Sequence, residues 1–295
     1  MANPLVWLDM DQAALDAAYD QSKYAPNQEF LRIRRNASAA IAREKLPAPK
    51  RFPYGPTPVE GLDVYLTDRP NAPINVFIHG GAWRNGMASE FAAYAEIFVR
   101  AGAHCVIVDF TNVDEAGGDL FPMVEQVRKA TAWVYRNAAS FGGNPDRLYV
   151  SGHSSGGHLT GNIVVTDWEK DFGLPQTILK GGLCCSGMYD LKPVRLSARS
   201  KYVNFTDAME QELSSIRHLD RLACPLVVAY GTQETPEFQR QGREFAAAVK
   251  AKGKLSELIV AEGYNHFEIL ETLANPYGLL GRAMLLLMGL NGRAA

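Results

Sequence analysis

The chain has 295 residues, of which 47% are hydrophobic and 21% are charged, a composition that supports a sizeable core. Its formal net charge of −2 is close to balance, so long-range electrostatics favour neither nucleic acid nor an anionic membrane surface as a partner. No apolar run is long enough to span a bilayer, and the first residues lack the cationic start and apolar centre of a secretory signal. We therefore expect a soluble, cytoplasmic protein.

The chain begins with helical sequence and then alternates between apolar runs and helical stretches. Residues Asp11–Leu46 are amphipathic and predict a helix, whereas the proline-rich stretch Pro47–Pro58 predicts an extended connector. The predicted strands that follow are Leu62–Leu66, Ile74–Ile78, His104–Val108, Leu148–Ser151, Ile178–Cys185, Leu226–Tyr230 and Leu255–Val260. The predicted helices are Ala88–Ala101, Phe121–Phe141, Ser155–Thr166, Pro236–Lys252 and a last helical region that begins at His266. This alternation is typical of an α/β protein whose mostly parallel central sheet has helices on both faces.

The pattern also predicts how the chain is divided. We expect residues 1–58 to form an N-terminal helical arm and connector that pack on the core, and residues 59–295 to form the α/β domain. Within that domain, residues 189–222 match neither strand nor helix periodicity and lie between two strands, which predicts a small cap over the site. Ligands of such sheets bind where loops leave the carboxyl ends of the strands, so candidate catalytic residues at those ends should share one site.

A candidate nucleophile follows the strand Leu148–Ser151, in the sequence Gly152-His-Ser-Ser-Gly156. A strand that turns directly into a helix at Ser154 forces the serine into a strained conformation and exposes its hydroxyl. The flanking glycines let neighbouring backbone approach, and the helix N-terminus directs free N–H groups at developing negative charge. Ser155 lies one step into the helix, so its N–H is better suited to be an oxyanion donor than its hydroxyl is to be the nucleophile.

A second glycine-rich loop follows the strand Ile74–Ile78, in the sequence His79-Gly-Gly-Ala-Trp83. Consecutive glycines let backbone N–H groups approach a tetrahedral oxyanion. In other enzymes each such donor stabilises the transition state by roughly 3 kcal/mol. Gly80 and Gly81 are therefore the expected oxyanion donors together with Ser155. His79 is expected to orient the loop, and Trp83 to form a pocket wall or to pack in the core.

The general base and the acid should follow the nucleophile in the chain. Only His218 and His266 come after Ser154 by a useful distance, and only His266 follows a strand. The acid should leave the strand Leu226–Tyr230, where Glu234 lies in the loop and is the preferred candidate. Asp190 and Glu237 remain alternatives, although Glu237 follows a proline at a helix start and suits the helix dipole. The order serine, acid, histidine is that of the α/β-hydrolase fold.

No metal or cofactor is expected. His153 and His158 lack the i, i+4 spacing of helical zinc ligands, and no C-x-x-C spacing occurs. Three of the four cysteines lie in or beside apolar runs, and all four are expected to be small core residues in a reduced compartment. They are Cys105, Cys184, Cys185 and Cys224.

Taken together, the motifs resemble those of the arylformamidases (kynurenine formamidases), α/β-hydrolases related to hormone-sensitive-lipase-like esterases. The resemblance rests on His79–Trp83, Gly152–Leu159 and Thr235-Pro-Glu-Phe-Gln-Arg-Gln241, and extends to Ala18–Asn27 and Ser186–Leu191. In that family an acidic residue precedes the Thr235–Gln241 segment and serves the triad, which implies the same role for Glu234. Many relatives have aspartate there, so this chain carries a longer side chain at that position.

The resemblance implies hydrolysis of N-formylkynurenine to kynurenine and formate through an acyl-enzyme. It also implies aromatic walls for the leaving group, for which Trp83, Tyr189 and Phe205 are candidates, and a cation for its carboxylate, for which the run Arg195–Lys201 is a candidate. The alternative is a carboxylesterase of broad specificity on short-chain or aryl esters or carbamates. A third hypothesis, an inactive binding module, predicts loss of a catalytic residue, and none is lost. A homodimer is compatible with the sequence, which does not set the oligomeric state.

Overall fold

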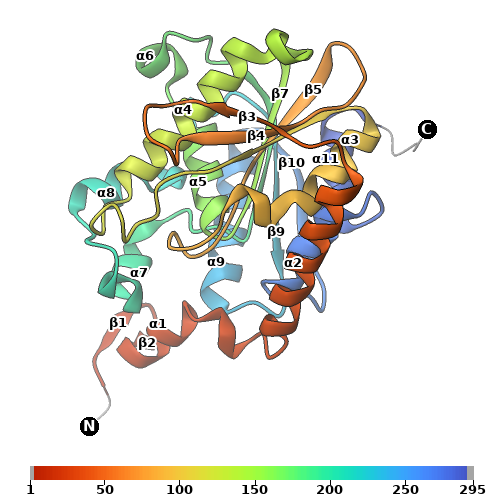
Figure 1. The fold of residues 1–295 in the computed structure, drawn as a ribbon. Helices are drawn as coiled ribbons and strands as arrows, with labels where there is room; N and C mark the ends of the chain where they lie inside the picture. The colour runs from red at the N-terminus through yellow and green to blue at the C-terminus, as the bar shows by residue number, and fades with distance from the viewer. Residues whose placement is uncertain (1–2, 291–295) are drawn as a thin grey trace.

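An eight-stranded sheet crosses the protein in the order β10-β9-β8-β7-β5-β6-β4-β3 (Figure 1). The structure is a computed structural model and describes residues 3–290. The sheet strands are β3 (Lys50–Pro53), β4 (Gly61–Tyr65), β5 (Ala72–Ile78), β6 (His104–Val108), β7 (Gly143–His153), β8 (Leu179–Cys185), β9 (Leu226–Gly231) and β10 (Leu255–Ala261). All pairs are parallel except those of β4, which is antiparallel to β3 and β6. The predicted mostly parallel sheet is confirmed.

Helices cover both faces of this sheet, and the alternating side chains of β5 show why. Val76 and Ile78 belong to one apolar cluster, whereas Phe77, which points to the opposite face, belongs to another. Helices α4 (Phe121–Asn137), α5 (Ser155–Val164) and α9 (Pro236–Ala251) contribute to the first cluster. Helices α2 (Gln28–Lys45), α3 (Ala95–Ala101) and α11 (Leu279–Leu287) contribute to the second. A strand that is buried on both faces therefore reads as a continuous apolar run.

The N-terminal arm differs from the single predicted helix Asp11–Leu46. Short strands β1 (Leu5–Trp7) and β2 (Met10–Asp11) precede α1 (Gln12–Ala18), and α2 begins only at Gln28. Between the helices, the side chain of Asp20 caps a 3-10 turn at Gln21–Lys23, and Pro26 restricts the residue before it to extended backbone. Helical periodicity continues across this break, but capping and proline chemistry end the first helix.

The predicted connector Pro47–Pro58 is also partly wrong, because it contains β3. This strand pairs with β4 at the edge of the sheet, where a proline is tolerated. Two predicted helices are shorter as α-helix than expected. Residues Ala88–Tyr94 form a 3-10 helix before α3, and Ala138–Phe141 form another after α4. The strand predicted at Leu148–Ser151 extends in both directions to form β7.

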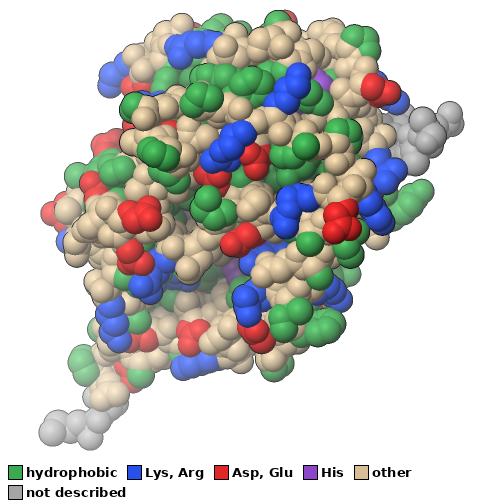
Figure 2. All heavy atoms as spheres, in the orientation of Figure 1, with side chains coloured by type: hydrophobic (Ala, Val, Ile, Leu, Met, Phe, Trp, Pro, Cys, Tyr) green, Lys and Arg blue, Asp and Glu red, His purple; other side chains and the backbone are tan. Residues whose placement is uncertain are grey.

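The segment 189–222, whose sequence matches neither strand nor helix periodicity, contains several short helices. It contains α7 (Leu191–Leu196), α8 (Asp207–Glu212) and 3-10 turns at Ala198–Lys201 and Ser215–Arg221. The remaining helices are α6 (Trp168–Phe172) and α10 (Glu268–Glu271). Among residues 3–290, no helix is both long and apolar enough to cross a membrane. Acidic and basic side chains are interspersed over the face in Figure 2, as the near-balanced charge predicts.

Because Leu15 of α1 is fully buried in the same cluster as Phe238 of α9, we expect the arm to be part of the folded unit. Leu15→Ala should lower the free energy of unfolding by about 2–5 kcal/mol, through lost apolar contact and a cavity. Urea unfolding followed by circular dichroism measures this loss. Ile33→Ala on exposed α2 surface is the control and should change it by less than about 0.5 kcal/mol. Equal effects of the two substitutions would contradict the prediction.

Candidate active site

Ser154 lies at the turn between β7 and α5, with φ 60° and ψ −127°. This left-handed conformation is strained for a residue with a side chain, and it points the hydroxyl away from the sheet. The turn is possible because glycines flank it. A β-carbon on Gly152 would lie 2.4 Å from the carbonyl oxygen of Gly156, and one on Gly156 would lie 2.1 Å from that of Ile78. The glycines in the motif therefore meet a packing requirement.

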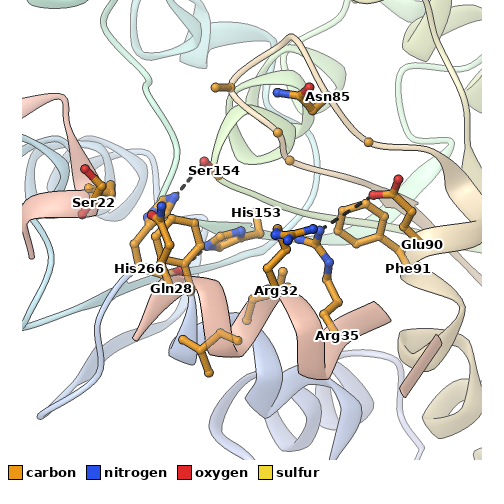
Figure 3. Close-up of a pocket in the computed structure, with 18 of the residues that line it drawn as sticks. Ser22, Gln28, Arg32, Arg35, Asn85, Glu90, Phe91, His153, Ser154 and His266 are labelled. Atoms are coloured by element: carbon orange, nitrogen blue, oxygen red, sulfur yellow. Dashed lines mark hydrogen bonds and ion pairs between the residues drawn. The ribbon is translucent and has the colours of Figure 1, made fainter. Parts of the chain in front are cut away.

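The structure brings three sequence-predicted residues into one hydrogen-bonded chain. His266 Nε2 lies 2.8 Å from Ser154 Oγ (Figure 3). On the other side of the ring, His266 Nδ1 lies 2.8 Å from Glu234 Oε2. Because a carboxylate only accepts, Nδ1 of the ring carries the proton and Nε2 accepts from the serine hydroxyl. Both His266 and Glu234 are buried. The longer side chain of glutamate thus reaches the histidine at ordinary hydrogen-bond length.

The acid is held by two further donors. Glu234 Oε1 accepts from the hydroxyl of Ser186 at 2.6 Å and from the amide of Gly231 at 2.7 Å. Ser186 has φ 50° and directly follows β8. Sequence reasoning missed Ser186, although its place at the carboxyl end of a strand is the signal that could have identified it.

The alternative acids are engaged elsewhere. Glu237 accepts from the hydroxyl of Tyr19 at 3.1 Å and pairs with Arg240 at 2.7 Å. Asp190 accepts from the amide of Lys192 and pairs with Arg217 at 3.1 Å. Neither carboxylate is hydrogen-bonded to His266, so the structure places only Glu234, of the three candidates, against the ring.

The glycine loop passes directly over the serine. A β-carbon on Gly80 would lie 2.8 Å from the carbonyl oxygen of His153 and 3.1 Å from Cβ of Ser154. Within residues 3–290, the amides of Gly80 and Gly81 have no hydrogen-bond partner, and Gly81 has φ 133°. The amide of Ser155, at the first position of α5, has no intrahelical partner either. These N–H groups are available to a developing oxyanion.

Aromatic stacking fixes the start of this loop. The ring of His79 lies between Phe110, at a centroid distance of 4.4 Å, and Phe91, at 5.2 Å. Its Nδ1 donates to the carbonyl oxygen of Gly80 at 3.0 Å. Burial lowers the pKa of His79, so the ring is neutral and acts on the loop through packing and one hydrogen bond.

His153 contacts His266 through a hydrogen bond and through its ring. Its Nε2 donates to the carbonyl oxygen of His266 at 2.8 Å, and the two ring centroids are 4.5 Å apart. Burial, followed by the proximity of His266, lowers the pKa of His153 well below its usual range. A neutral His153 therefore orients the neighbouring histidine without adding a competing positive charge.

The N-terminal arm contacts both loops of the triad. The amide of Thr235, next to Glu234, donates to Gln21 Oε1 at 3.2 Å. Asn265, next to His266, donates through its side chain to Asn27 Oδ1 at 2.8 Å. Asn27 in turn donates to Glu268 at 2.7 Å. The arm thus links the acid loop to the histidine loop.

A cavity of about 760 Å³ opens at Ser154, between the arm and the glycine loop. Figure 3 shows Ser22 and Gln28 toward the His266 side and Arg32, Arg35, Glu90 and Phe91 toward the other side of His153. Sequence reasoning missed the lining role of the arm. The arginines of α2 were the available signal, but an amphipathic helix alone does not show which face meets a ligand.

The three predicted aromatic walls do not line this cavity. Trp83 is buried and donates through Nε1 to His158 Nδ1 at 3.2 Å, and Tyr189 stacks on Phe245 with centroids 3.9 Å apart. Phe205 packs against the first apolar cluster, which contains Val76 and Ile78. These predictions are wrong because large apolar rings gain more from core burial than from an open pocket.

The predicted basic run divides in two. Arg199 lines the cavity, whereas Arg195 forms ion pairs with Asp207 and Glu210. In residues 3–290, no group of three or more His, Cys, Asp or Glu side chains is arranged to hold a metal ion.

Comparisons with known proteins relate the chain to formamidases and esterases. A family model described as BD-FAE matches residues 62–175. Kynurenine formamidase of Danio rerio is 30% identical over 297 residues, which cover 96% of this chain and 98% of that protein. Esterase LipC of Mycobacterium tuberculosis is 27% identical over 68% of this chain and 55% of its own length. The propionate-bound esterase 2 of Thermogutta terrifontis shares the fold, with a TM-score of 0.68, 21% identity and coverage of 83% of this chain and 96% of that one.

Burial of His158 should make folding sensitive to mild acid. Burial lowers its pKa from 6.5 to about 4, so the unfolded chain takes up a proton at a pH where native His158 remains neutral. Stability should therefore fall as pH drops from 7 to 4.5, with roughly 2 to 3 kcal/mol from this residue. The lowered pKa values of His79 and His153 act in the same direction.

The test is urea unfolding of the wild type and His158→Gln at pH 7.0 and 4.5. We expect the variant to lose less stability between the two pH values than the wild type, because it lacks one proton-binding group. An identical loss in both proteins would show that His158 does not contribute.

Proposed function

Because this chain belongs to the kynurenine formamidase family, we propose that its substrate is N-formylkynurenine and its products are kynurenine and formate. The chain is an α/β-hydrolase of small-molecule amides or esters, as the related formamidases and esterases are. The observation that supports the proposal most directly is the hydrogen-bonded chain from Ser154 through His266 to Glu234. It opens into a cavity whose volume is within the range of small-molecule sites.

In the proposed reaction, Ser154 Oγ attacks the formyl carbon while its proton passes to Nε2 of His266. The amides of Gly80, Gly81 and Ser155 donate to the oxyanion of the tetrahedral intermediate. When the C–N bond breaks, Nε2 of His266 returns the proton to the leaving aromatic amine. Glu234 stabilises the imidazolium that exists between these two transfers.

The second half of the reaction repeats these roles with water. His266 takes a proton from a water molecule, and the resulting hydroxide attacks the formyl ester on Ser154. The intermediate collapses to formic acid, which loses its proton to solvent to give formate, while His266 returns its proton to Ser154 Oγ. A formyl group carries only hydrogen beside its carbonyl, so it needs no acyl pocket where Gly80 approaches Ser154 closely.

A carboxylesterase is the alternative function, and the similarity to esterase LipC favours it. Esters are easier to cleave than amides, so ester turnover alone does not separate the two proposals. We therefore compare kcat/KM for N-formylkynurenine with that for p-nitrophenyl acetate. A formamidase should have the higher value for the formamide. Absence of formamide turnover in an enzyme that cleaves the ester would reject the first proposal in favour of the alternative.

The identity of the acid is tested by Glu234→Gln. The amide keeps the size of the side chain but removes the charge that fixes the histidine tautomer, so kcat should fall by roughly 10³- to 10⁴-fold. Steady-state rates on p-nitrophenyl acetate measure the loss. Asp190→Asn is the matched control, because its carboxylate pairs with Arg217, and it should change kcat by less than about threefold. A large loss in Asp190→Asn with a small loss in Glu234→Gln would reverse the assignment.

A further inference from the structure

Three arginines line the cavity, and they differ in whether a carboxylate neutralises them. Arg32 forms an ion pair with Glu29, and Arg35 lies 3.8 Å from Glu90. Arg199 has no carboxylate within ion-pairing distance in the part of the chain that the structure describes. Its positive charge is therefore available to an anionic group that enters the cavity.

The guanidinium of Arg199 is held in place rather than free to move. One terminal nitrogen donates to the hydroxyl of Tyr202 at 2.6 Å, and the other donates to the carbonyl oxygen of Tyr19 at 3.2 Å. The group also lies over the ring of Trp83, 5.5 Å from its centroid. Trp83 is the last residue of the glycine loop, and Arg199 lines the same cavity as Ser154. Arginine has five N–H donors, so donors remain for a carboxylate.

An acidic side chain lies on the same wall. Asp20 follows Tyr19 and lines the cavity, yet it forms no ion pair with Arg199. One oxygen of Asp20 accepts from the amide of Ser22 at 3.1 Å and from its hydroxyl at 2.6 Å. The other oxygen has no hydrogen-bond partner among residues 3–290. Asp20 can therefore accept from a ligand while it caps the turn.

This wall lies on the leaving-group side of the site. Gln21, next to Asp20, is hydrogen-bonded to Thr235 in the acid loop. In Figure 3, Ser22 lies toward His266, whereas Arg35 lies on the other side of His153. His266 is the group that protonates the leaving amine in the proposed reaction. A head group on the aromatic ring that carries this amine would therefore extend toward Asp20 and Arg199.

We propose that Arg199 binds the carboxylate, and Asp20 the ammonium, of a zwitterionic α-amino-acid head group on the substrate. This inference rests on the proposed function and names the residues that select its leaving group. Two opposite charges on one wall of the cavity match the two charges of a zwitterion. When the ligand binds, its carboxylate and ammonium replace the water molecules that hydrate Arg199 and Asp20. A neutral aryl ester offers neither charge, so the site discriminates among leaving groups rather than acyl groups.

The test measures inhibition of p-nitrophenyl acetate hydrolysis, which does not depend on formamide turnover. The inhibitors are L-kynurenine and 2′-aminoacetophenone, the same aromatic ketone without the amino-acid head group. The wild type should bind L-kynurenine more tightly. Arg199→Gln and Asp20→Asn should each raise the inhibition constant for L-kynurenine by about 10-fold or more, and change that for 2′-aminoacetophenone much less. Asparagine at position 20 keeps an oxygen that can accept from Ser22, so the turn is retained.

The matched control is Arg195→Gln, in the same segment as Arg199, whose ion pairs with Asp207 and Glu210 lie away from the cavity lining. It should leave both inhibition constants unchanged, and the thermal unfolding midpoint of each variant reports its folding. The proposal is overturned if wild-type protein binds the two inhibitors equally, or if Arg199→Gln weakens both to the same extent. If the expected pattern appears in an enzyme that does not cleave N-formylkynurenine, the proposed function fails while the head-group site stands.

Discussion

The hydrogen bond between Nδ1 of His266 and Glu234 decides which ring nitrogen faces Ser154, and the chemistry of the site depends on that orientation. A carboxylate is stable in the core only when donors surround it. Glu234 has three: the ring of His266, the hydroxyl of Ser186 and the amide of Gly231. His266 lies in the loop after β10, Ser186 directly follows β8 and Gly231 is the last residue of β9, and these three strands are neighbours in the sheet. Because these strands are parallel, their carboxyl ends lie together and bring Glu234 and its three hydrogen-bond donors to one end of the sheet.

Two residues with strained backbone lie at the carboxyl ends of the strands, and hydrogen bonds to neighbouring strands stabilise both. Ser154 and Ser186 have positive φ angles, which cost on the order of 1–3 kcal/mol each in a residue with a side chain. The amide of Ser154 donates to the carbonyl of Cys185, and the amide of Ser186 donates to the carbonyl of Ala229. Each turn is thus tied to the adjacent strand, so the strain that exposes one hydroxyl and aims the other at Glu234 is offset by backbone hydrogen bonds.

The central features could be predicted because local sequence determines them. An apolar strand, a glycine-flanked serine and a helix specify the turn at Ser154, and chain order specifies His266 and Glu234. The aromatic walls could not be predicted, since Trp83 in the core has the same composition signal as a residue in a pocket. The arm was predicted as one helix because periodicity does not register the cap at Asp20 or the restriction at Pro26. The division into arm and domain remains a prediction.

The N-terminal arm contributes both to the cavity wall and to the contacts that hold the loops of Glu234 and His266. Gln21 and Asn27 contact the loops that carry Glu234 and His266, and Asp20 and Gln21 line the cavity. A displacement of the arm would therefore move the cavity wall and the supports of Glu234 and His266 together. Because α1 is anchored in the main core through Leu15, such a displacement costs core burial. Leaving-group selection and triad geometry consequently depend on the same packing, and a substitution that displaces the arm is expected to affect both, whereas one that leaves the arm in place is not.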